Sequence, residues 1–499
     1  MAALATAPRD GTGSETRGES GGTRYSVATM SHPVASRRAT PRVPVLVRPT
    51  MGDMRALATL ALPVMTVEMG MMAMHVVDAL FVGHLSATAL AAVSLALAYY
   101  FTIVVIGMGT LVGLDALVSQ AVGAGDDAGV RRALQRGLLL AAGLCVPLAL
   151  ILWPTAPILR ALHQPDEIIP IATRVVHISI LGLPGALAFV VLRQTLQSME
   201  RLRPIIVTVV VANLINIVCN WLLIAGRLGA PALGVDGSAI ASVIGRTSMP
   251  LILLWLGRDV LWPLLRTRDP LLFELQPILR MLRIGVPVGV QYLLEVGVFN
   301  AVALLMGVQA TATLAAHQVA INLASFTFMM PLGIGAAASV LVGQAIGRED
   351  PGAARRAAVA ALTAGLLTSL CTTVLFLAIP TPLASAYVTE PGVVALAASL
   401  IPLAGVFQLF DGVQAVAGGA LRGAADTRAA MLANILGFWM VGLPIGLTLA
   451  FRAGMGPRGL WWGLVIGLAA VAAVLVVRLY HLFGGPLSRV HVDGLRTIH

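Results

Sequence analysis

Lysine is absent from this sequence, and all 33 basic residues are arginine. A phosphate-binding loop of the G-x-x-x-x-G-K-[ST] type requires a lysine. The chain therefore cannot bind ATP through such a loop. We do not expect an ATP-driven pump whose motor lies in the same chain.

Charged residues of either sign are scarce as well. They make up 11% of the 499 residues, whereas 58% are hydrophobic, and the mean hydropathy is +0.89. An average soluble protein is about 25% charged. A soluble fold of this composition would expose large apolar patches. The composition therefore indicates a protein that lies in a lipid bilayer.

Groups that commonly carry chemistry are few. The three cysteines, Cys145, Cys219 and Cys371, lie inside hydrophobic runs and read as small apolar fillers. We expect no disulfide, no metal site built on them and no cofactor. The sequence has no H-E-x-x-H, no G-x-S-x-G and no paired aspartate motif on facing spans, so we do not expect an enzyme.

Long apolar runs are present throughout the chain. Segments 137–159, 204–226 and 429–451 carry no charge, and each is long enough for a transmembrane helix of about 20 residues. We see no alternation of apolar and polar residues of the kind that a membrane β-barrel would need. We predict an all-α integral membrane protein with twelve transmembrane helices, at approximately 56–82, 88–115, 134–157, 169–192, 204–226, 237–257, 281–306, 314–346, 357–380, 393–421, 429–451 and 459–481.

The first 50 residues differ from the rest. They are rich in Gly, Ser, Thr and Arg and contain no apolar run, whereas a cleavable signal peptide needs an apolar core of about 7–15 residues. We predict a disordered tail over 1–50. A mis-assigned start codon, with Met51 or Met54 as the true first residue, is the alternative interpretation.

Arginine placement predicts the orientation. With a cytoplasmic N-terminus, the external loops hold four arginines, Arg160, Arg227, Arg452 and Arg458. The cytoplasmic loops then hold sixteen, namely Arg131, Arg132, Arg136, Arg193, Arg201, Arg203, Arg258, Arg266, Arg268, Arg280, Arg283, Arg348, Arg355, Arg356, Arg422 and Arg428. Cytoplasmic loops of membrane proteins carry an excess of basic residues. We therefore predict a plasma-membrane protein, the bacterial inner membrane being the expected location, with both termini in the cytoplasm.

The sequence contains an internal repeat. Residues 118–123 (VSQAVG) match 342–347 (VGQAIG) at an offset of 224, and Pro63 matches Pro287 at the same offset. Six spans per repeat predict two parallel lobes related by a pseudo-two-fold axis along the membrane normal, with substrate between them. We assign 51–257 to an N-lobe (helices 1–6), 258–280 to a cytoplasmic linker, 281–482 to a C-lobe (helices 7–12) and 483–499 to a cytoplasmic tail.

A few acidic side chains fall inside predicted spans, where charge is costly and usually marks function. Asp78, Glu295 and Asp411 do not follow the repeat, which favours a functional role over a purely structural one. Such carboxylates can bind Na⁺, H⁺ or a cationic substrate, and competition among these would give antiport.

Other polar residues in the spans are less specific. We interpret Glu68 either as a relay or as a local hydrogen-bonding partner. His75 lies three residues before Asp78, and we interpret it either as a proton relay or as a polar filler. Asp115 reads as either a functional acid or a solvated helix end. Arg246 is expected to pair with an acid or with backbone carbonyls.

Several motifs resemble those of one transporter family. They are 77–83 (VDALFVG), 90–94 (LAAVS), 285–287 (GVP) with 294–297 (LEVG), 315–322 (AAHQVAIN), 410–414 (FDGVQ), and 419–423 (GALRG) with 426–428 (DTR). Because of these motifs, the chain from 55 to 480 resembles the multidrug and toxic compound extrusion (MATE) family, in its NorM-like branch.

The resemblance implies a secondary active multidrug efflux transporter that exports organic cations, often aromatic drugs or dyes, in antiport with Na⁺ or H⁺ by alternating access. It places the C-lobe cation site, a candidate Na⁺ site, at Glu295 and Asp411, and the N-lobe acid at Asp78. Asn216, Asn220 and Ser242 match N-lobe cation-binding positions, although Asn220 stands where some members have an acid and Ser242 where some have Thr.

Alternatives remain open at this point. Asn216 and Asn220 lie four residues apart on one helix face and could simply join helices by hydrogen bonds. His75 and Glu68 keep proton coupling open beside Na⁺. A flippase for lipids or lipid-linked precursors could share the two-lobe architecture, but one that handles anionic head groups should line its cavity with cations. We expect a monomer and no nucleic-acid partner.

Overall fold

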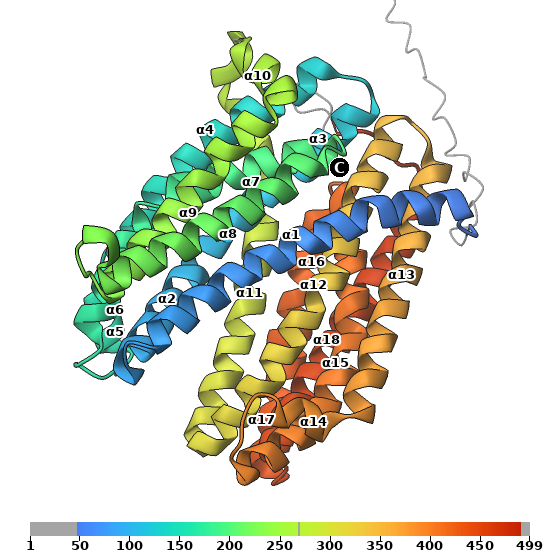
Figure 1. Ribbon diagram of the computed structural model, residues 1–499. Coiled ribbons are helices and arrows are strands. Elements are labelled where there is room, and N and C mark those ends of the chain that lie inside the picture. Colours follow the sequence, from blue (N-terminus) through green and yellow to red (C-terminus); the bar gives the residue numbers. More distant parts are fainter. Residues whose placement is uncertain (1–46, 268–269, 491–499) are drawn as a thin grey trace, which may run out of the picture. The chain divides into compact units, whose positions relative to one another are not determined.

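The computed structural model describes residues 47–267 and 270–490, all within one compact unit. The predicted tail 1–50 therefore lies almost entirely outside the described residues, as does the end of the predicted C-terminal tail. The described part contains helices and no strand. Figure 1 shows most helices of the first half, coloured blue to green, gathered apart from those of the second half, coloured yellow to red, whereas the blue helix α1 (Met51–Gly83) runs across to the second group and contacts α12 (Thr311–Gly347) and α13 (Pro351–Ala378).

The first half is built from nine α-helices and a short 3₁₀ turn. They are α1 (Met51–Gly83), α2 (Ala87–Val112), α3 (Asp115–Gly123), α4 (Asp127–Leu152), α5 (Thr155–Ala161), α6 (Ile169–Ile180), α7 (Leu183–Ser198), α8 (Leu202–Ala225), η1 (Arg227–Gly229) and α9 (Val235–Leu256). A linker of α10 (Arg258–Arg266) and η2 (Pro270–Phe273) leads to the second half.

The second half consists of long helices and one irregular span. They are α11 (Leu275–Gln309), α12 (Thr311–Gly347), α13 (Pro351–Ala378), α14 (Pro380–Ser385), α15 (Pro391–Gly423), α16 (Thr427–Asn434), η3 (Ile435–Gly442), α17 (Leu443–Leu447), η4 (Thr448–Arg452) and α18 (Pro457–Phe483). The segments η3 and η4 are π-helical, and η3, α17 and η4 continue α16 into a single apolar span.

The number of spans confirms the prediction of twelve. Eleven helical segments of the described chain are long and apolar enough to cross a membrane. The twelfth is the pair α6 and α7, which is bent by 49° between Ile180 and Leu183. Leu181 and Gly182 close the bend with backbone bonds to Ile178 and Ser179, and Pro184 stands at the start of α7, where a missing N–H costs nothing.

Two expectations about boundaries were wrong. Helix α11 begins at Leu275, inside the predicted linker. The second span continues past Gly113 into α3, so that Asp115 lies in the first turn of α3 with a 1% exposed side chain. Its carboxylate accepts a hydrogen bond from Ser198 Oγ at 3.0 Å. Asp115 is therefore a buried partner of α7, not a solvated helix end.

The turns that join the spans repeat between the halves. The turn after α3 has Gly125 at φ 67° and its counterpart after α12 has Glu349 at φ 57°. The N–H of Asp126 donates to Ala121 O at 2.9 Å, and that of Asp350 donates to Ala345 O at 3.0 Å. This is the six-to-one bond of a Schellman helix end. The sequence repeat is thus also a repeat of local backbone geometry.

The two halves meet through matched close contacts, each made by a glycine. A Cβ on Gly109 of α2 would lie 2.7 Å from the Gly289 Cα of α11. At the repeat offset of 224, Gly109 corresponds to Gly333 of α12 and Gly289 to Met65 of α1. These two are also in contact, since a Cβ on Gly333 would lie 2.9 Å from the Met65 backbone N. Close backbone approach of this kind is how membrane helices pack without a hydrophobic driving force.

Candidate functional site

The acid of the first half lies among several hydrogen-bond donors. Asp78 of α1 has a 2% exposed side chain. Its Oδ1 accepts hydrogen bonds from Asn216 Nδ2 at 3.0 Å and from Asn220 Nδ2 at 2.8 Å. Its Oδ2 accepts one from Ser242 Oγ at 2.6 Å. Four of the six residues proposed from the sequence for this lobe are thus brought together from three helices, and Glu68 and His75 are not among them.

Helix periodicity explains how this pocket forms. Asn216 and Asn220 are one turn apart on α8, so both side chains face α1. Gly245 of α9 lies against the Asn216 side chain: a Cβ on Gly245 would lie 3.6 Å from Asn216 Cβ. Because glycine lacks this atom, Ser242, one turn earlier on α9, has room beside the asparagines. The asparagines do join helices by hydrogen bonds, and the group that they bond is the candidate carboxylate itself.

Two oxygens of this pocket have no hydrogen-bond partner among the described residues. Asn216 Oδ1 and Asn220 Oδ1 are both buried and unpaired. Oxygen atoms of carboxylate and amide groups are the ligands that hard cations such as Na⁺ take in proteins. Asp78, Asn216 and Asn220 could therefore hold such a cation.

Glu68 has a structural partner. Its Oε1 lies 3.0 Å from Arg193 Nη1, and each side chain is 14% exposed. Arg193 belongs to α7, so placing it in a cytoplasmic loop was wrong. The ion pair neutralises two charges that would be costly in a bilayer and ties α1 to α7.

His75 and Asp78 differ in environment although they are one turn apart. His75 lies at the surface of the described chain, whereas Asp78 is buried. Asp78 receives its bonds from α8 and α9. The arrangement brings Asn216, Asn220 and Ser242 onto Asp78 and leaves His75 outside this set.

Arg246 has a partner that the sequence did not indicate. Its guanidinium carbon lies 5.0 Å from the centre of the Tyr100 ring, which joins α9 to α2. This is the geometry of a cation–π contact. The contact that the structure shows is therefore with an aromatic ring, whereas the sequence led us to expect an acid or a backbone carbonyl. The planar guanidinium stacks on an aromatic face as readily as it bonds a carboxylate.

The acids of the second half form a pair with fewer donors. Asp411 of α15 is 5% exposed, and Glu295 of α11 is half-buried. The two carboxyl groups are close enough to repel each other. Gln414, one turn after Asp411, donates through Nε2 to Glu295 Oε1 at 3.5 Å, a long bond. The Gln414 Oε1 atom is buried and unpaired.

Gln414 was not among the predicted site residues. The signal was its spacing of three from Asp411, which puts both side chains on one helix face. Glu295, Asp411 and Gln414 together offer carboxylate and amide oxygens to one cation. Trp439 of η3 donates its Nε1–H to Leu294 O at 3.0 Å, which holds α11 next to the irregular span.

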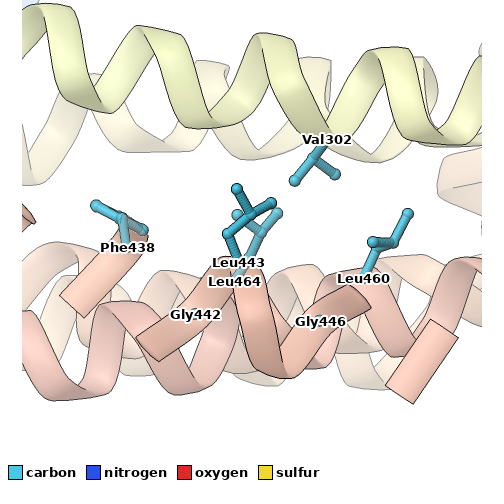
Figure 2. Close-up of a pocket in the computed structure, with 7 residues that line it drawn as sticks. All are labelled: Val302, Phe438, Gly442, Leu443, Gly446, Leu460 and Leu464. Carbon is cyan, nitrogen blue, oxygen red and sulfur yellow. The ribbon is translucent and has the colours of Figure 1, made fainter. Parts of the chain in front are cut away.

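Aromatic side chains pack beside this pair. Phe299 of α11 lies edge-on to Phe407 and Phe438, at ring distances of 5.9 and 6.2 Å, and Phe407 meets Trp461 in the same manner. Figure 2 shows a pocket further along α11, lined by Val302, Phe438, Gly442, Leu443, Gly446, Leu460 and Leu464. Every lining residue is apolar, so this pocket offers no ligand for a cation.

Comparison with known proteins gives the family. The MatE family model matches twice, over residues 63–222 and 287–448, and these two matches agree with the repeat offset found in the sequence. A probable multidrug resistance protein NorM of Rhizobium meliloti is 35% identical, over 86% of this chain and 93% of that protein. A multidrug resistance protein NorM of Burkholderia vietnamiensis is 38% identical, over 85% of this chain and 93% of that protein.

Solved structures agree in fold. The eukaryotic MATE transporter AtDTX14 superposes with a TM-score of 0.80 at 24% identity, over 86% of this chain and 95% of that chain. A MATE protein in complex with MaD3S superposes with a TM-score of 0.77 at 19% identity, over 89% of this chain and 98% of that chain. At these identities the structures support the fold alone. On the family model and the NorM relatives, the chain belongs to the MatE family of membrane transporters.

Proposed function

We propose that this protein exports small organic cations in exchange for Na⁺ or H⁺, by alternating access between its two lobes. The NorM relatives are multidrug resistance proteins by name, which supports drugs or dyes as substrates. The observation that carries the proposal is the Glu295–Asp411 pair, two neighbouring carboxyl groups within the second lobe.

The chemistry follows from the shortage of donors at that pair. Two neighbouring carboxylates repel, and burying unpaired charge is costly. One long bond from Gln414 does not neutralise them. A Na⁺ ion, a proton or a cationic substrate would each relieve the repulsion, and these cannot all occupy the pair at once. Competition for one pair of charges then couples inward movement of the ion to outward movement of the substrate.

We assign Na⁺ as the coupling ion at Glu295 and Asp411, because carboxylate and amide oxygens surround the position. Asp78 with Asn216, Asn220 and Ser242 is the proposed cation site of the first lobe. Glu68 already has a partner in Arg193, so we give it a structural role. His75 would enter the mechanism only if protons drive transport.

The orientation and assembly are also part of the proposal. The excess of arginine in alternate loops supports cytoplasmic termini and an inner-membrane location. We propose a monomer as the transporting unit. A flippase for anionic head groups would need cationic groups at its binding site. Here carboxyl, amide and hydroxyl groups form the first-lobe site, and carboxyl and amide groups form the second-lobe site.

The test uses purified protein in liposomes and follows ethidium under an imposed Na⁺ gradient and, separately, under a proton gradient. Transport driven by Na⁺ that is lost in Glu295→Gln and Asp411→Asn supports the proposal. Glu390→Gln is the matched control, because this exposed carboxylate stands at the start of the helix that carries Asp411. No movement of several organic cations under either gradient would overturn the proposal, and the flippase would then be tested with labelled lipids.

A further inference from the structure

The repeated glutamines of the two halves bridge the lobes reciprocally. Gln120 of α3 donates through Nε2 to Gly423 O, at the end of α15, at 2.9 Å. Gln344 of α12 donates through Nε2 to Ser198 O, at the end of α7, also at 2.9 Å. Gln344 is the repeat counterpart of Gln120, and Gly423 is that of Ser198, because the turns after α7 and α15 match at an offset of 225, with Glu200 at φ 59° and Ala425 at φ 60°. Both glutamine side chains are buried.

The backbone around these glutamines leaves no room for side chains. A Cβ on Gly123 would lie 2.1 Å from Gln344 O, and one on Gly347 would lie 2.1 Å from Gln120 O. Gly343 lies against the side chain of Ser119, its own repeat counterpart, so the pseudo-two-fold axis passes between them. The lobes are thus closed tightly at the end of the molecule where α3 and α12 end.

The segment that follows α18 breaks this symmetry. Beyond Phe483 the chain leaves the second lobe, and Leu487 still packs on the buried cluster formed by that half. Val490 packs on the cluster formed mainly by the first half. Its N–H donates to Gln120 Oε1 at 2.8 Å. The segment therefore runs from one lobe to the other beside the glutamine contact.

An ion pair fixes the far end of this segment. Arg489 Nη2 lies 2.6 Å from Asp126 Oδ2, in the turn after α3. Burial alone would raise the pKa of Asp126, but hydrogen bonds from Arg489 and from the Gly129 N–H outweigh it and hold the pKa below its ordinary value. The Asp126 carboxylate is therefore charged at neutral pH, and the pair is complete.

Within residues 47–267 and 270–490, the repeat counterpart of Gln120 has no such attachment. Gln344 Oε1 receives a hydrogen bond of 3.5 Å from Nη1 of Arg348, the residue that directly follows α12. Gln120 instead uses its Nε2 to reach the second lobe and its Oε1 to hold the C-terminal segment. One buried amide thus joins α3, α15 and the segment after α18.

We propose that residues 484–490 form a strap that holds this side of the inter-lobe interface closed, through Gln120 and Asp126, and that detaches when the lobes separate here during transport. The inference rests on the alternating access proposed above, and with the proposed orientation the strap lies on the cytoplasmic side. Separation of the lobes must break both glutamine bridges. Because the strap is anchored in the second lobe, separation must also pull it off the first.

The experiment measures the distance between the lobes in the full chain. Cys145, Cys219 and Cys371 are replaced by alanine, and spin labels are placed at Glu200→Cys and Glu349→Cys, two exposed positions in turns of the first and second halves. Pulsed electron paramagnetic resonance in liposomes then reports the fractions of short and long distances. Ethidium transport is measured on the same preparations.

Three variants weaken the strap in different ways. Arg489→Gln removes the cation, and Asp126→Asn removes the charge while keeping a side chain that can cap α4. Val490→Pro removes the N–H that reaches Gln120. The matched control is Arg478→Gln, because Arg478 pairs with Asp426 at the same 2.6 Å but within the second half.

We expect each strap variant to raise the ratio of long to short distances by roughly three- to tenfold, which lies within the range for the net contribution of one hydrogen bond. Arg478→Gln should leave the ratio unchanged. Arg489→Gln combined with Asp126→Asn should match either single change, because both remove the same contact. Distance distributions in all three variants equal to that of the control would overturn the strap.

The outcome separates the strap from the proposed function. If the unsubstituted chain transports ethidium and the variants do not alter the distances, the strap is wrong and the transport function stands. If the variants alter the distances but the unsubstituted chain moves no cation, the strap stands and the proposed function fails.

Discussion

The acids of the two lobes differ in how many donors each one has. Asp78 in the first lobe receives three hydrogen bonds, all at 3.0 Å or less. Glu295 and Asp411 in the second lobe lie together, and Gln414 reaches only Glu295, with a bond of 3.5 Å. Amide and hydroxyl dipoles can hold the single charge of Asp78 in place. The pair in the second lobe has two carboxyl groups and far less compensation.

This difference separates two ways of keeping an acid inside a membrane protein. A carboxylate with several donors is stable in its pocket and becomes part of the packing. A carboxylate pair with few donors is stable only when a cation or a proton joins it. The second lobe therefore depends on its ligand more strongly than the first, and substitutions in the two lobes should change stability in opposite directions.

The largest effect is expected at the second-lobe pair. Glu295→Gln or Asp411→Asn should reduce ethidium transport by at least about 30-fold, since losing one partner of a buried charged contact costs about 2–5 kcal/mol. Removing one of two repelling charges should leave the Tm of the ion-free protein equal or higher. Added Na⁺ should then raise the Tm by less than it raises that of the unsubstituted protein, because only the first-lobe site is left. A rise with Na⁺ in both variants as large as that of the unsubstituted protein would contradict a cation site at this pair.

In the first lobe, Asp78→Asn should have the opposite effect on stability. One new donor would face the donors of Asn216, Asn220 and Ser242, and each donor left unpaired costs about 1–3 kcal/mol. We expect a lower Tm and transport reduced by roughly tenfold. Asn213→Ala is the matched control, because Asn213 also bonds α1, through Gly70 O at 3.0 Å, without touching Asp78. A Tm for Asp78→Asn above that of the unsubstituted protein would break the comparison.

Much of this comparison was accessible from the sequence. Run length predicts a span because a helix of about 20 apolar residues must cross the bilayer, and the offset of 224 predicts the paired lobes. The contacts of Asp78 with α8 and α9 could be predicted from the family resemblance. The partners of Arg193 and Arg246 could not be predicted, because the length of an apolar run gives neither the depth of a helix in the membrane nor its rotation about its axis. Arg193 read as a loop residue, yet it lies in α7 against Glu68.

The strap residues were hidden for a related reason. Residues 484–490 carry neither an apolar run nor a motif, so nothing local indicates their contacts. The bond from Val490 to Gln120 joins positions 370 residues apart. Such a contact depends on where α18 ends relative to α3, which follows only from the packing of all the helices between them.

A substitution can make the first lobe resemble the second. Asn220→Asp would place a second carboxylate beside Asp78, where the Asn220 amide now lies 2.8 Å away. Without a cation, repulsion should lower the free energy of unfolding by roughly 1–4 kcal/mol, the range for like charges about 4 Å apart near a protein surface. We expect Na⁺ to restore this loss in a titration followed by Tm. Asn220→Ser, which adds no charge, is the control and should gain no Na⁺ dependence.

The smallest effect on transport is expected at Glu68, which lies on the same helix as Asp78 but pairs with an arginine. Glu68→Gln should lower the free energy of unfolding by roughly 1–3 kcal/mol, because it leaves Arg193 without its charged partner. Transport per folded molecule should stay within about threefold of that of the unsubstituted protein, because the Glu68–Arg193 ion pair holds two helices together and takes no part in ion exchange. Arg193→Gln should behave alike, and the double substitution should cost less than the two single losses together. If Glu68→Gln instead abolishes transport driven by protons while Arg193→Gln does not, Glu68 carries protons, and the first lobe holds a coupling acid besides Asp78.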